Sequence, residues 1–216
     1  KQMRKIFIIL LYSQLFFSQS NEGKDNIFCI KTNPLSLVDV YGSYSYRIGL
    51  ETKIYKKIAF SAEAGNYFNY GKNDEIRDNS KGHIIKPEVK WYVNKNGRTD
   101  GDFVSLEYTY KDISFDWKDS IPTTSEPNRV INYRIHKNIN CLTAKIGNLK
   151  VYTNNFIFEW FVGIGLRISK GNDSLTDEER DRIRAYDESE ISSAQKNVNY
   201  FLPNLSLGIK VGYRLY

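Results

Sequence analysis

Hydrolytic chemistry would need a nucleophile beside a histidine, and this chain has only two histidines. His83 follows Ser80 by three residues, whereas His136 stands far away in the sequence. A serine hydrolase or acyltransferase needs a serine, a histidine within hydrogen-bond reach and a carboxylate behind that histidine. His83 falls where a loop is expected to meet a strand, and a solvated histidine is common there. An enzyme that modifies lipids is therefore the weaker interpretation, and we assign no catalytic residue.

Cofactor and metal chemistry have little support in the sequence. Cys29 and Cys141 form neither a Cys-x-x-Cys motif nor a disulfide framework, and we expect both to be free thiols. The acidic stretch from Asp177 to Glu188 lacks the ligand spacing of an EF-hand calcium loop. We predict no cofactor-binding residue and no metal site.

Residues 1–20 predict a secretory signal peptide. A basic start precedes an apolar stretch from Ile6 to Phe17, and small and polar residues follow. We therefore divide the chain into a signal peptide, residues 1–20, and one exported domain, residues 21–216. The exported part has nearly balanced charge and no Lys/Arg cluster, so we expect no nucleic-acid partner.

The length and composition suit a single all-β domain. The chain has 216 residues, among them 16 Tyr and 12 Phe, residues that favour strands. Its mean hydropathy of −0.51 is low, and no apolar run is long enough for a membrane-spanning helix. A membrane protein of this composition would have to cross the bilayer with strands.

From residue 44 onward, apolar and polar residues alternate with a period of two, which predicts strands. The expected strands are residues 26–38, 44–54, 58–65, 85–93, 104–111, 129–151, 156–168 and 204–215. Pro34 interrupts the first. In the strand from 129 to 151 the apolar phase slips by one residue, which predicts a bulge between His136 and Cys141. Pro87 predicts either another bulge or one lost ladder bond.

The connections between these strands are of two kinds. Short ones are expected at residues 55–57, 94–102 and 148–155, and long polar ones at residues 69–82, 116–128 and 169–198. Alternation of long and short connections is typical of an up-and-down barrel with tight turns at one rim and extended loops at the other.

The polar face of the strands is expected to line the lumen of the barrel. An eight-stranded barrel is just wide enough for side chains to fill it, and unpaired buried charges would be costly. Gly163, Gly165, Gly208 and Gly212 lie on this face and would make room for long neighbours. We predict one connected network of lumen charges, formed by Glu51, Glu63, Glu88, Lys90, Glu107, Lys145, Glu159, Arg167, Lys210 and Arg214.

The aromatic residues predict two girdles of the kind found at membrane interfaces. The first, near the long-loop rim, contains Tyr44, Tyr46, Phe68, Tyr70, Tyr108, Tyr110, Tyr133 and Phe201. The second, near the short-turn rim, contains Phe60, Trp91, Phe156, Phe158 and Tyr213. The sequence ends within an aromatic strand, and we expect Tyr213, Leu215 and Tyr216 to serve membrane insertion.

Four segments carry a resemblance to a known class of proteins: residues 31–35, 86–92, 163–167 and 205–214. With the strand spacing, they resemble the small outer-membrane β-barrels of unknown function found in Bacteroidota-type Gram-negative bacteria, and more loosely the OmpA and OmpX barrels. The resemblance implies an eight-stranded antiparallel up-and-down transmembrane barrel located in the outer membrane. It implies no catalytic residue.

The longest connection, residues 169–198, is expected to be partly helical. Thr176 and Glu179 have the spacing of a capping box, and Asp177 and Glu178 add negative charge to the first turn. We expect this extracellular loop to bind whatever partner the barrel recognises.

The sequence favours a non-enzymatic component of the cell envelope, with a structural or partner-binding role. Its expected partners are the lipid bilayer of the outer membrane and other envelope proteins. Three alternatives stay open: a soluble lipocalin-like barrel that binds a ligand, the barrel-embedded lipid-modifying enzyme considered above, and a conducting pore.

Overall fold

A computed structural model describes residues 28–37, 44–68, 77–93, 100–121, 129–179, 181 and 196–215. The predicted signal peptide, residues 1–20, lies outside this described part of the chain. The same is true of Tyr70, of Tyr216 and of most of the loop between β7 and β8.

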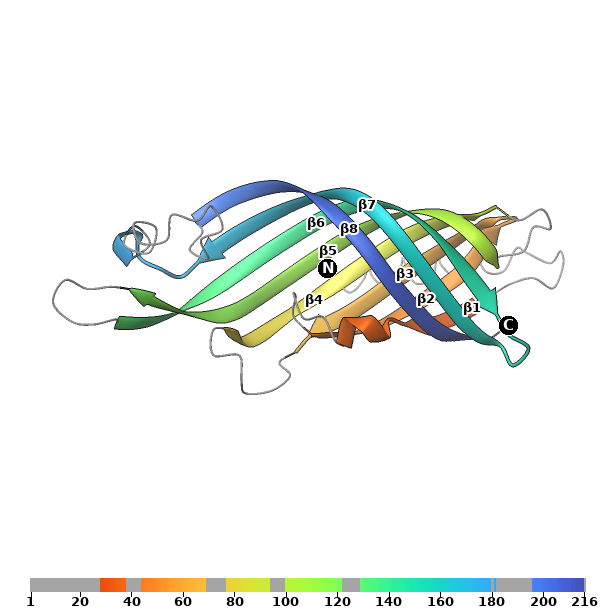
Figure 1. The fold of residues 1–216 in the computed structure, drawn as a ribbon, viewed down its shortest axis with the longest axis horizontal. Helices are drawn as coiled ribbons and strands as arrows, with labels where there is room; N and C mark the ends of the chain where they lie inside the picture. The colour runs from red at the N-terminus through yellow and green to blue at the C-terminus, as the bar shows by residue number, and fades with distance from the viewer. Residues whose placement is uncertain are drawn as a thin grey trace, which may run out of the picture.

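Eight strands and one short 3-10 helix, η1, make up the fold (Figure 1). Their bounds are β1 Phe28–Thr32, η1 Pro34–Leu37, β2 Ser45–Tyr55, β3 Ile58–Tyr67, β4 Arg77–Tyr92, β5 Gly101–Ile121, β6 Arg129–Val151, β7 Phe156–Asp173 and β8 Lys196–Arg214. Pro34 begins η1, and the first strand therefore ends at Thr32. This strand is shorter than the predicted one, residues 26–38.

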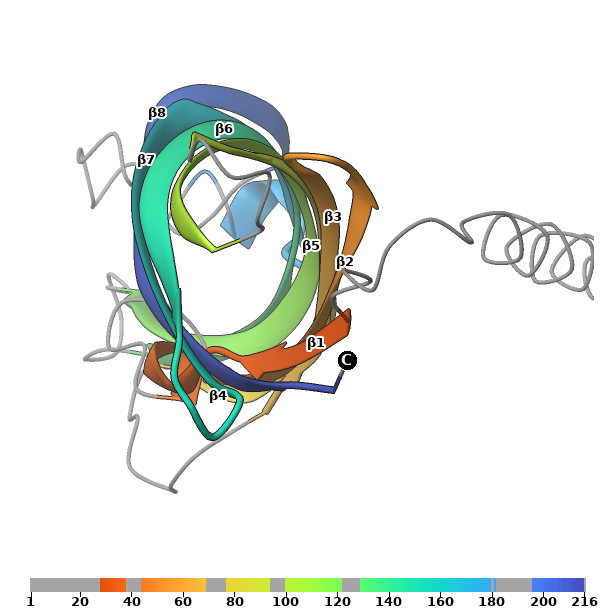
Figure 2. The same cartoon turned by 90° about the vertical axis from the view of Figure 1, so that its right-hand side faces the viewer.

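The strands form one closed barrel in which each pairs antiparallel with its neighbours in the sequence. The ring is visible when the barrel is viewed along its length (Figure 2). β1 and β8 complete it through four residue pairs, from Cys29↔Arg214 to Thr32↔Val211. The predicted eight-stranded, all-β, up-and-down architecture is therefore confirmed.

The two ends of the barrel differ, as the connection lengths predicted. Tight turns join β2 to β3 at Lys56 and Lys57, and β6 to β7 at residues 152–155. At the opposite end β5 and β7 run further than the alternation suggested, whereas β6 has the predicted bounds, and Figure 1 shows these three strands projecting past β2 and β3. We call these the short-turn end and the long-loop end.

The bulge predicted in β6 is wrong. Pairing of β6 with β5 and with β7 continues without a register shift from one end to the other. The apolar phase slips because the inner face itself becomes apolar near the long-loop end, where Tyr133 and Ile135 are buried. The strand therefore keeps its orientation while the chemistry of its inner face changes.

At Lys86 and Pro87 the β4–β5 ladder is unpaired, but the register is unchanged. The pairs run from Ile85↔Tyr110 directly to Glu88↔Glu107, and the alignment is the same on both sides of the gap. Pro87 has no N–H to donate, which accounts for the lost ladder bond. Of the two outcomes that the sequence allowed, the structure has the lost bond.

Two apolar clusters lie inside the barrel, one toward each end. The basal cluster, near the short-turn end, contains Cys29, Ala59, Tyr92, Phe103, Leu149, Ile157 and Phe161. The distal cluster, near the long-loop end, contains Tyr67, Ile84, Ile113, Phe115, Tyr133, Ile135 and Leu175. Both cysteines are buried free thiols.

Glycines on the inner face make room for large neighbours, as the sequence suggested. A Cβ atom at Gly208 would overlap the Phe161 ring. That ring is fixed, because the ammonium groups of Lys145 and Lys210 lie 4.3 and 5.3 Å from its centroid. Gly49 also faces the lumen, but there a Cβ would find ordinary contacts at 3.5 Å and beyond.

We predict that Gly208→Ala destabilises the barrel by about 1–3 kcal/mol, the usual cost of overpacking a filled interior. Urea-induced unfolding followed by tryptophan fluorescence measures the change. Gly49→Ala is the matched control and should leave the unfolding midpoint nearly unchanged. Equal midpoints for the two variants would contradict the tight packing around Phe161.

Candidate functional site: a charged lumen inside an apolar surface

The ten residues predicted to line the lumen are not equally buried. Eight of them are almost completely inaccessible to solvent: Glu51, Glu63, Glu88, Lys90, Glu107, Lys145, Glu159 and Lys210. Arg167 and Arg214 are partly exposed. The inner face of the strands is therefore the charged face, except in the two apolar clusters.

A first group of charges, the proximal cluster, lies just above the basal cluster. Lys31 Nζ is 2.7 Å from Glu51 Oε2 and 2.6 Å from Glu159 Oε2, and Lys90 Nζ is 2.8 and 2.6 Å from the same two carboxylates. The Tyr92 hydroxyl also donates to Glu51, at 2.6 Å. Two cations and two anions thus neutralise one another in a compact square.

A second group, the central cluster, lies closer to the middle of the barrel. Here Glu88 and Glu107 are direct cross-strand neighbours on β4 and β5. Lys145 pairs with Glu107 and lies 3.8 Å from Glu88. The remaining ion pairs are Lys86–Glu107 at 3.0 Å, Lys210–Glu88 at 3.3 Å, Lys210–Glu63 at 3.4 Å and Arg47–Glu63 at 3.8 Å.

The cations of the central cluster offset a repulsion between two carboxylates that the strand register places side by side. Two like charges directly opposite each other destabilise a sheet, and Glu88 and Glu107 would repel each other inside a medium of low dielectric constant. Lys145 lies between them, and Ser105 donates a hydrogen bond of 2.6 Å to Glu88. The carboxylates are therefore both paired and hydrogen-bonded, which a buried charge requires.

The sequence predicted one network, whereas the observed ion pairs form two separate groups. Among the described residues, no ion pair joins the proximal cluster to the central one, and Arg167 has no ion pair with any of these glutamates. The prediction also missed Lys31, Arg47 and Lys86. Lys31 was missed because Pro34 interrupts the alternation of β1. Its position two residues after Cys29 places both side chains on the same face of the strand, which would have indicated a lumen residue.

The outer surface has the opposite character. Large apolar side chains stand exposed around the whole barrel and form what we call the outer belt: Ile48, Leu50, Phe60, Val89, Trp91, Val104, Leu106, Leu142, Ile146, Trp160, Val162, Ile164, Leu205 and Leu207. Ile164 is 68% exposed and Leu207 is 81% exposed. An apolar patch of this extent is rare on a protein that faces only water.

Three tyrosines mark the edge of the outer belt nearest the long-loop end. The Tyr46 hydroxyl accepts a hydrogen bond from Asn66 at 3.0 Å, and the Tyr108 hydroxyl donates to Asn140 at 2.5 Å. Tyr110 accepts from Asn138 at 2.8 Å. Each ring thus lies at the edge of the belt while its hydroxyl forms a hydrogen bond with an asparagine on a neighbouring strand.

One member of the predicted girdle is wrong, because Tyr133 is buried in the distal cluster rather than exposed. Beyond the tyrosines, the outward positions of β5 are polar or charged: Asp112, Ser114, Asp116 and Lys118. At the other end of the belt Trp91, Phe156 and Tyr213 are exposed aromatics.

Within the described part of the chain, neither histidine forms a hydrogen bond with a serine hydroxyl. The His83 ring lies against Tyr110, with centroids 5.8 Å apart, and His136 Nε2 is 3.7 Å from Asp112 Oδ2. Ser114 is the cross-strand neighbour of His136, but its hydroxyl accepts a hydrogen bond from Arg134. The described residues therefore contain no serine–histidine hydrogen bond of the kind that hydrolysis would use.

The capping box predicted at the start of the long connection is present. The Thr176 hydroxyl accepts a hydrogen bond from the backbone N–H of Glu179, whose carboxylate accepts one from the backbone N–H of Thr176, at 3.3 and 3.1 Å. A helical turn begins at Asp177. Leu175, directly before it, packs into the distal cluster and so attaches the loop to the barrel. The rest of the loop, to residue 195, lies outside the described residues.

The described part of the chain supports neither a metal site nor a membrane-spanning helix. No group of three His, Cys, Asp or Glu side chains there could hold a metal ion. No helix among these residues has the length and apolar character needed to cross a membrane. No protein-family model, no curated protein and no solved structure matches the sequence or the fold.

We predict that Glu107→Leu lowers the free energy of unfolding by about 3 kcal/mol or more, because it leaves Lys145 and Lys86 buried without their main partner. The unfolding midpoint in urea is the measurement. Asp181→Leu, at an exposed site of the helical turn, is the control and should cost no more than about 0.5 kcal/mol. A wild-type midpoint for Glu107→Leu would contradict the paired state of the central cluster.

Proposed function

We propose that this protein is a non-enzymatic β-barrel of the bacterial outer membrane, with a structural or partner-binding role in the cell envelope. The observation that carries the proposal is the reversed distribution of polarity. Paired charges fill the lumen, and apolar side chains cover the outside. A membrane barrel has this arrangement because its outer face meets lipid and its interior need not.

A soluble lipocalin-like barrel is poorly supported by the same observation. Such a protein would hold its ligand in an apolar lumen and turn its charges to water. Here Lys90 and Glu159 are completely buried inside, while Leu205 and Ile164 stand exposed outside. The hydrogen-bonded tyrosines at the edge of the outer belt favour a lipid interface as well.

The filled lumen argues against a conducting pore. The basal cluster closes the interior near the short-turn end, and Tyr92, Leu149 and Ile157 are at most 1% exposed there. The proximal and central clusters occupy the next levels. A barrel closed in this way would act through its surfaces, and the proposal assigns recognition to the long connections. In the proposed orientation the short turns face the periplasm and the long connections face the outside.

We predict that Ile164→Arg destabilises the barrel folded in phosphatidylcholine vesicles. Its free energy of unfolding should fall by about 2–4 kcal/mol, the cost of an arginine at the centre of a lipid-facing band. Ile164 is suitable because it lies midway along the apolar outward positions of β7, between Trp160 and Ile168. The mobility of unheated samples on a gel, compared with heated ones, gives the folded fraction across a urea series.

Asn132→Arg is the matched control, since Asn132 is exposed on the outward face of β6 beyond the outer belt. It should fold as the wild type does. A soluble barrel would tolerate arginine equally well at both sites, so indistinguishable folding of the two variants would contradict a membrane location.

Partner binding through the longest connection makes a separate prediction. Deleting residues 174–194 should leave the barrel folded and inserted, because β7 and β8 keep their ladder on the barrel side of the loop. The same deletion should abolish co-purification of envelope proteins in mild detergent. Replacing residues 122–128 with a Gly-Ser linker is the control. Capture of the same proteins by the deletion variant would place recognition elsewhere on the molecule.

A further inference from the structure

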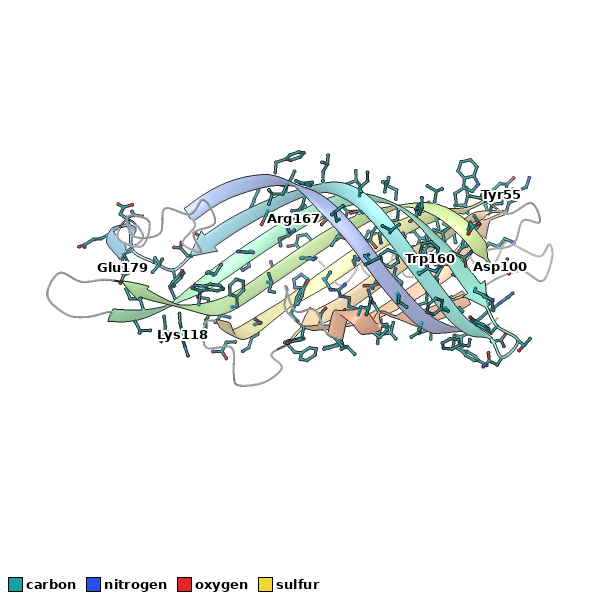
Figure 3. All side chains as sticks on the ribbon, in the orientation of Figure 1. Tyr55, Asp100, Lys118, Trp160, Arg167 and Glu179 are labelled. Atoms are coloured by element: carbon teal, nitrogen blue, oxygen red, sulfur yellow. The ribbon has the colours of Figure 1, made fainter. Side chains whose placement is uncertain are left out.

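A polar pocket opens among outward-facing side chains near the long-loop end. Its volume is about 480 Å³, which is within the usual range for sites that bind small molecules. Figure 3 shows Lys118, one of its lining residues, at the same end of the molecule as Glu179 and far from Tyr55. The walls come from separate elements: Asn79 of β4, Asp116 and Lys118 of β5, Asn132 and Arg134 of β6, and Ser174 directly after β7.

Hydrogen bonds and an ion pair hold the walls of the pocket in place. Asp116 Oδ2 accepts a hydrogen bond of 2.8 Å from the Asn79 amide, and Asp116 Oδ1 lies 3.7 Å from Arg134 Nη1. Arg134 also donates from Nη2 to the Ser114 hydroxyl at 3.1 Å, and from its backbone N–H to the Ser174 hydroxyl at 3.0 Å. The lining is therefore oriented before any ligand binds, which lowers the entropic cost of binding.

The β4 wall depends on an irregularity of the strand. The register between β4 and β5 shifts between Asp78 and Lys81, and Asn79, within this shift, has a positive φ of 52°. A positive φ is uncommon outside glycine, although asparagine adopts it more readily than most residues. Bulges often re-aim a side chain next to a functional site. Here the irregularity accompanies the hydrogen bond from the Asn79 amide to the Asp116 carboxylate, across the floor of the pocket.

The lining offers hydrogen bonds in both directions beside a cation. The Asp116 carboxylate accepts hydrogen bonds, and the Asn79 and Asn132 amides both donate and accept them. Lys118 is exposed, and no ion pair joins it to another residue in the described part of the chain. Tyr133 is the one aromatic residue of the described lining. The pocket therefore suits a hydrophilic ligand with hydroxyl groups and a negative charge.

We infer that this pocket binds an acidic sugar, whose hydroxyl groups bond to Asp116 and to the two asparagine amides while its carboxylate or phosphate pairs with Lys118. A sugar hydroxyl both donates and accepts hydrogen bonds, so it matches an amide and a carboxylate side by side. A neutral sugar would leave Lys118 without an ionic contact. An inorganic anion would leave the amides unused, and the Asp116 carboxylate would repel it.

The position of the pocket along β5 indicates where such a sugar would come from. Asp116 lies beyond Tyr110, at the edge of the outer belt, by at most about 20 Å along the strand at about 3.3 Å per residue. In the proposed orientation the pocket stands outside the bilayer and faces sideways. A free acidic sugar or the sugar chain of a neighbouring glycolipid would reach it there. The choice of source rests on the proposed membrane location, whereas the binding chemistry requires the fold alone.

The test measures dissociation constants by titration calorimetry on the refolded full chain in detergent micelles. The probes are glucuronic acid, glucose 6-phosphate, glucose and inorganic phosphate. We expect both acidic sugars to bind at least about tenfold more tightly than glucose, because glucose lacks the charge-assisted contact. Glucose 6-phosphate should also bind at least about tenfold more tightly than inorganic phosphate, which lacks the hydroxyl contacts.

Two variants and one control assign the contacts to residues. Lys118→Gln should weaken the binding of both acidic sugars about tenfold and leave the binding of glucose unchanged, a selectivity that a general disturbance of the fold would not produce. Asp116→Ala should weaken the binding of all three sugars about tenfold. Lys150→Gln removes an exposed lysine of β6 at the short-turn end and should bind as the wild type does.

Three results would overturn the inference: no binding of either acidic sugar, equal binding of glucose 6-phosphate and inorganic phosphate, which would indicate a site for free anions, and wild-type binding of the acidic sugars by Lys118→Gln. The first two use the wild type alone and decide the question even if a variant does not fold.

Purified lipopolysaccharide distinguishes the two sources, since its displacement of bound glucuronic acid would identify a glycolipid and a lack of displacement would identify a free sugar. None of these measurements requires membrane insertion. A failure here therefore overturns the sugar site alone, whereas the comparison of Ile164→Arg with Asn132→Arg tests the membrane location separately.

Discussion

Every charge placed inside this barrel needs a partner, and that requirement organises the rest of the structure. Removing an ion from water costs several kcal/mol unless an opposite charge and hydrogen bonds replace the water. Lys90 and Glu159, both fully buried, meet the condition only because β4 and β7 lie across the lumen from each other. Lys31 and Glu51 complete the same square from β1 and β2. A strand register shifted by one residue would turn these charges outward, so the ion pairs and the ring of strands specify one another.

The apolar clusters at the two ends follow from the same condition. Bulk water at the charged levels would weaken each ion pair, because the attraction falls as the dielectric constant rises. Phe103 and Phe161 bring both clusters of charge into contact with aromatic rings: Lys90 lies 4.4 Å from the first ring and Lys145 lies 4.3 Å from the second. Gly208 is needed so that the Phe161 ring can occupy the narrow interior.

The architecture was predictable from the sequence, whereas the pairing inside it was not. Alternation with a period of two fixed the number of strands, and the connection lengths fixed their order. The same alternation misled at β6, where Tyr133 and Ile135 are apolar on the inner face and imitated a bulge. Periodicity reports a change of polarity and cannot distinguish a shifted strand from an altered lumen. The division of the charges into two clusters depends on which strands face each other across the ring. A local sequence pattern does not give the distance between two such strands.

The length of β5 and β6 has a mechanical consequence. β5 continues from Tyr110, at the edge of the outer belt, to Ile121, and β6 pairs with it throughout. At about 3.3 Å per residue this extension reaches roughly 35 Å along the strand. The distal cluster braces it from inside through Ile113 and Phe115. In the proposed orientation these paired strands form a stiff extension that ends at most about 35 Å beyond the outer belt, so a molecule that bound at its tip would be held at that distance from the bilayer.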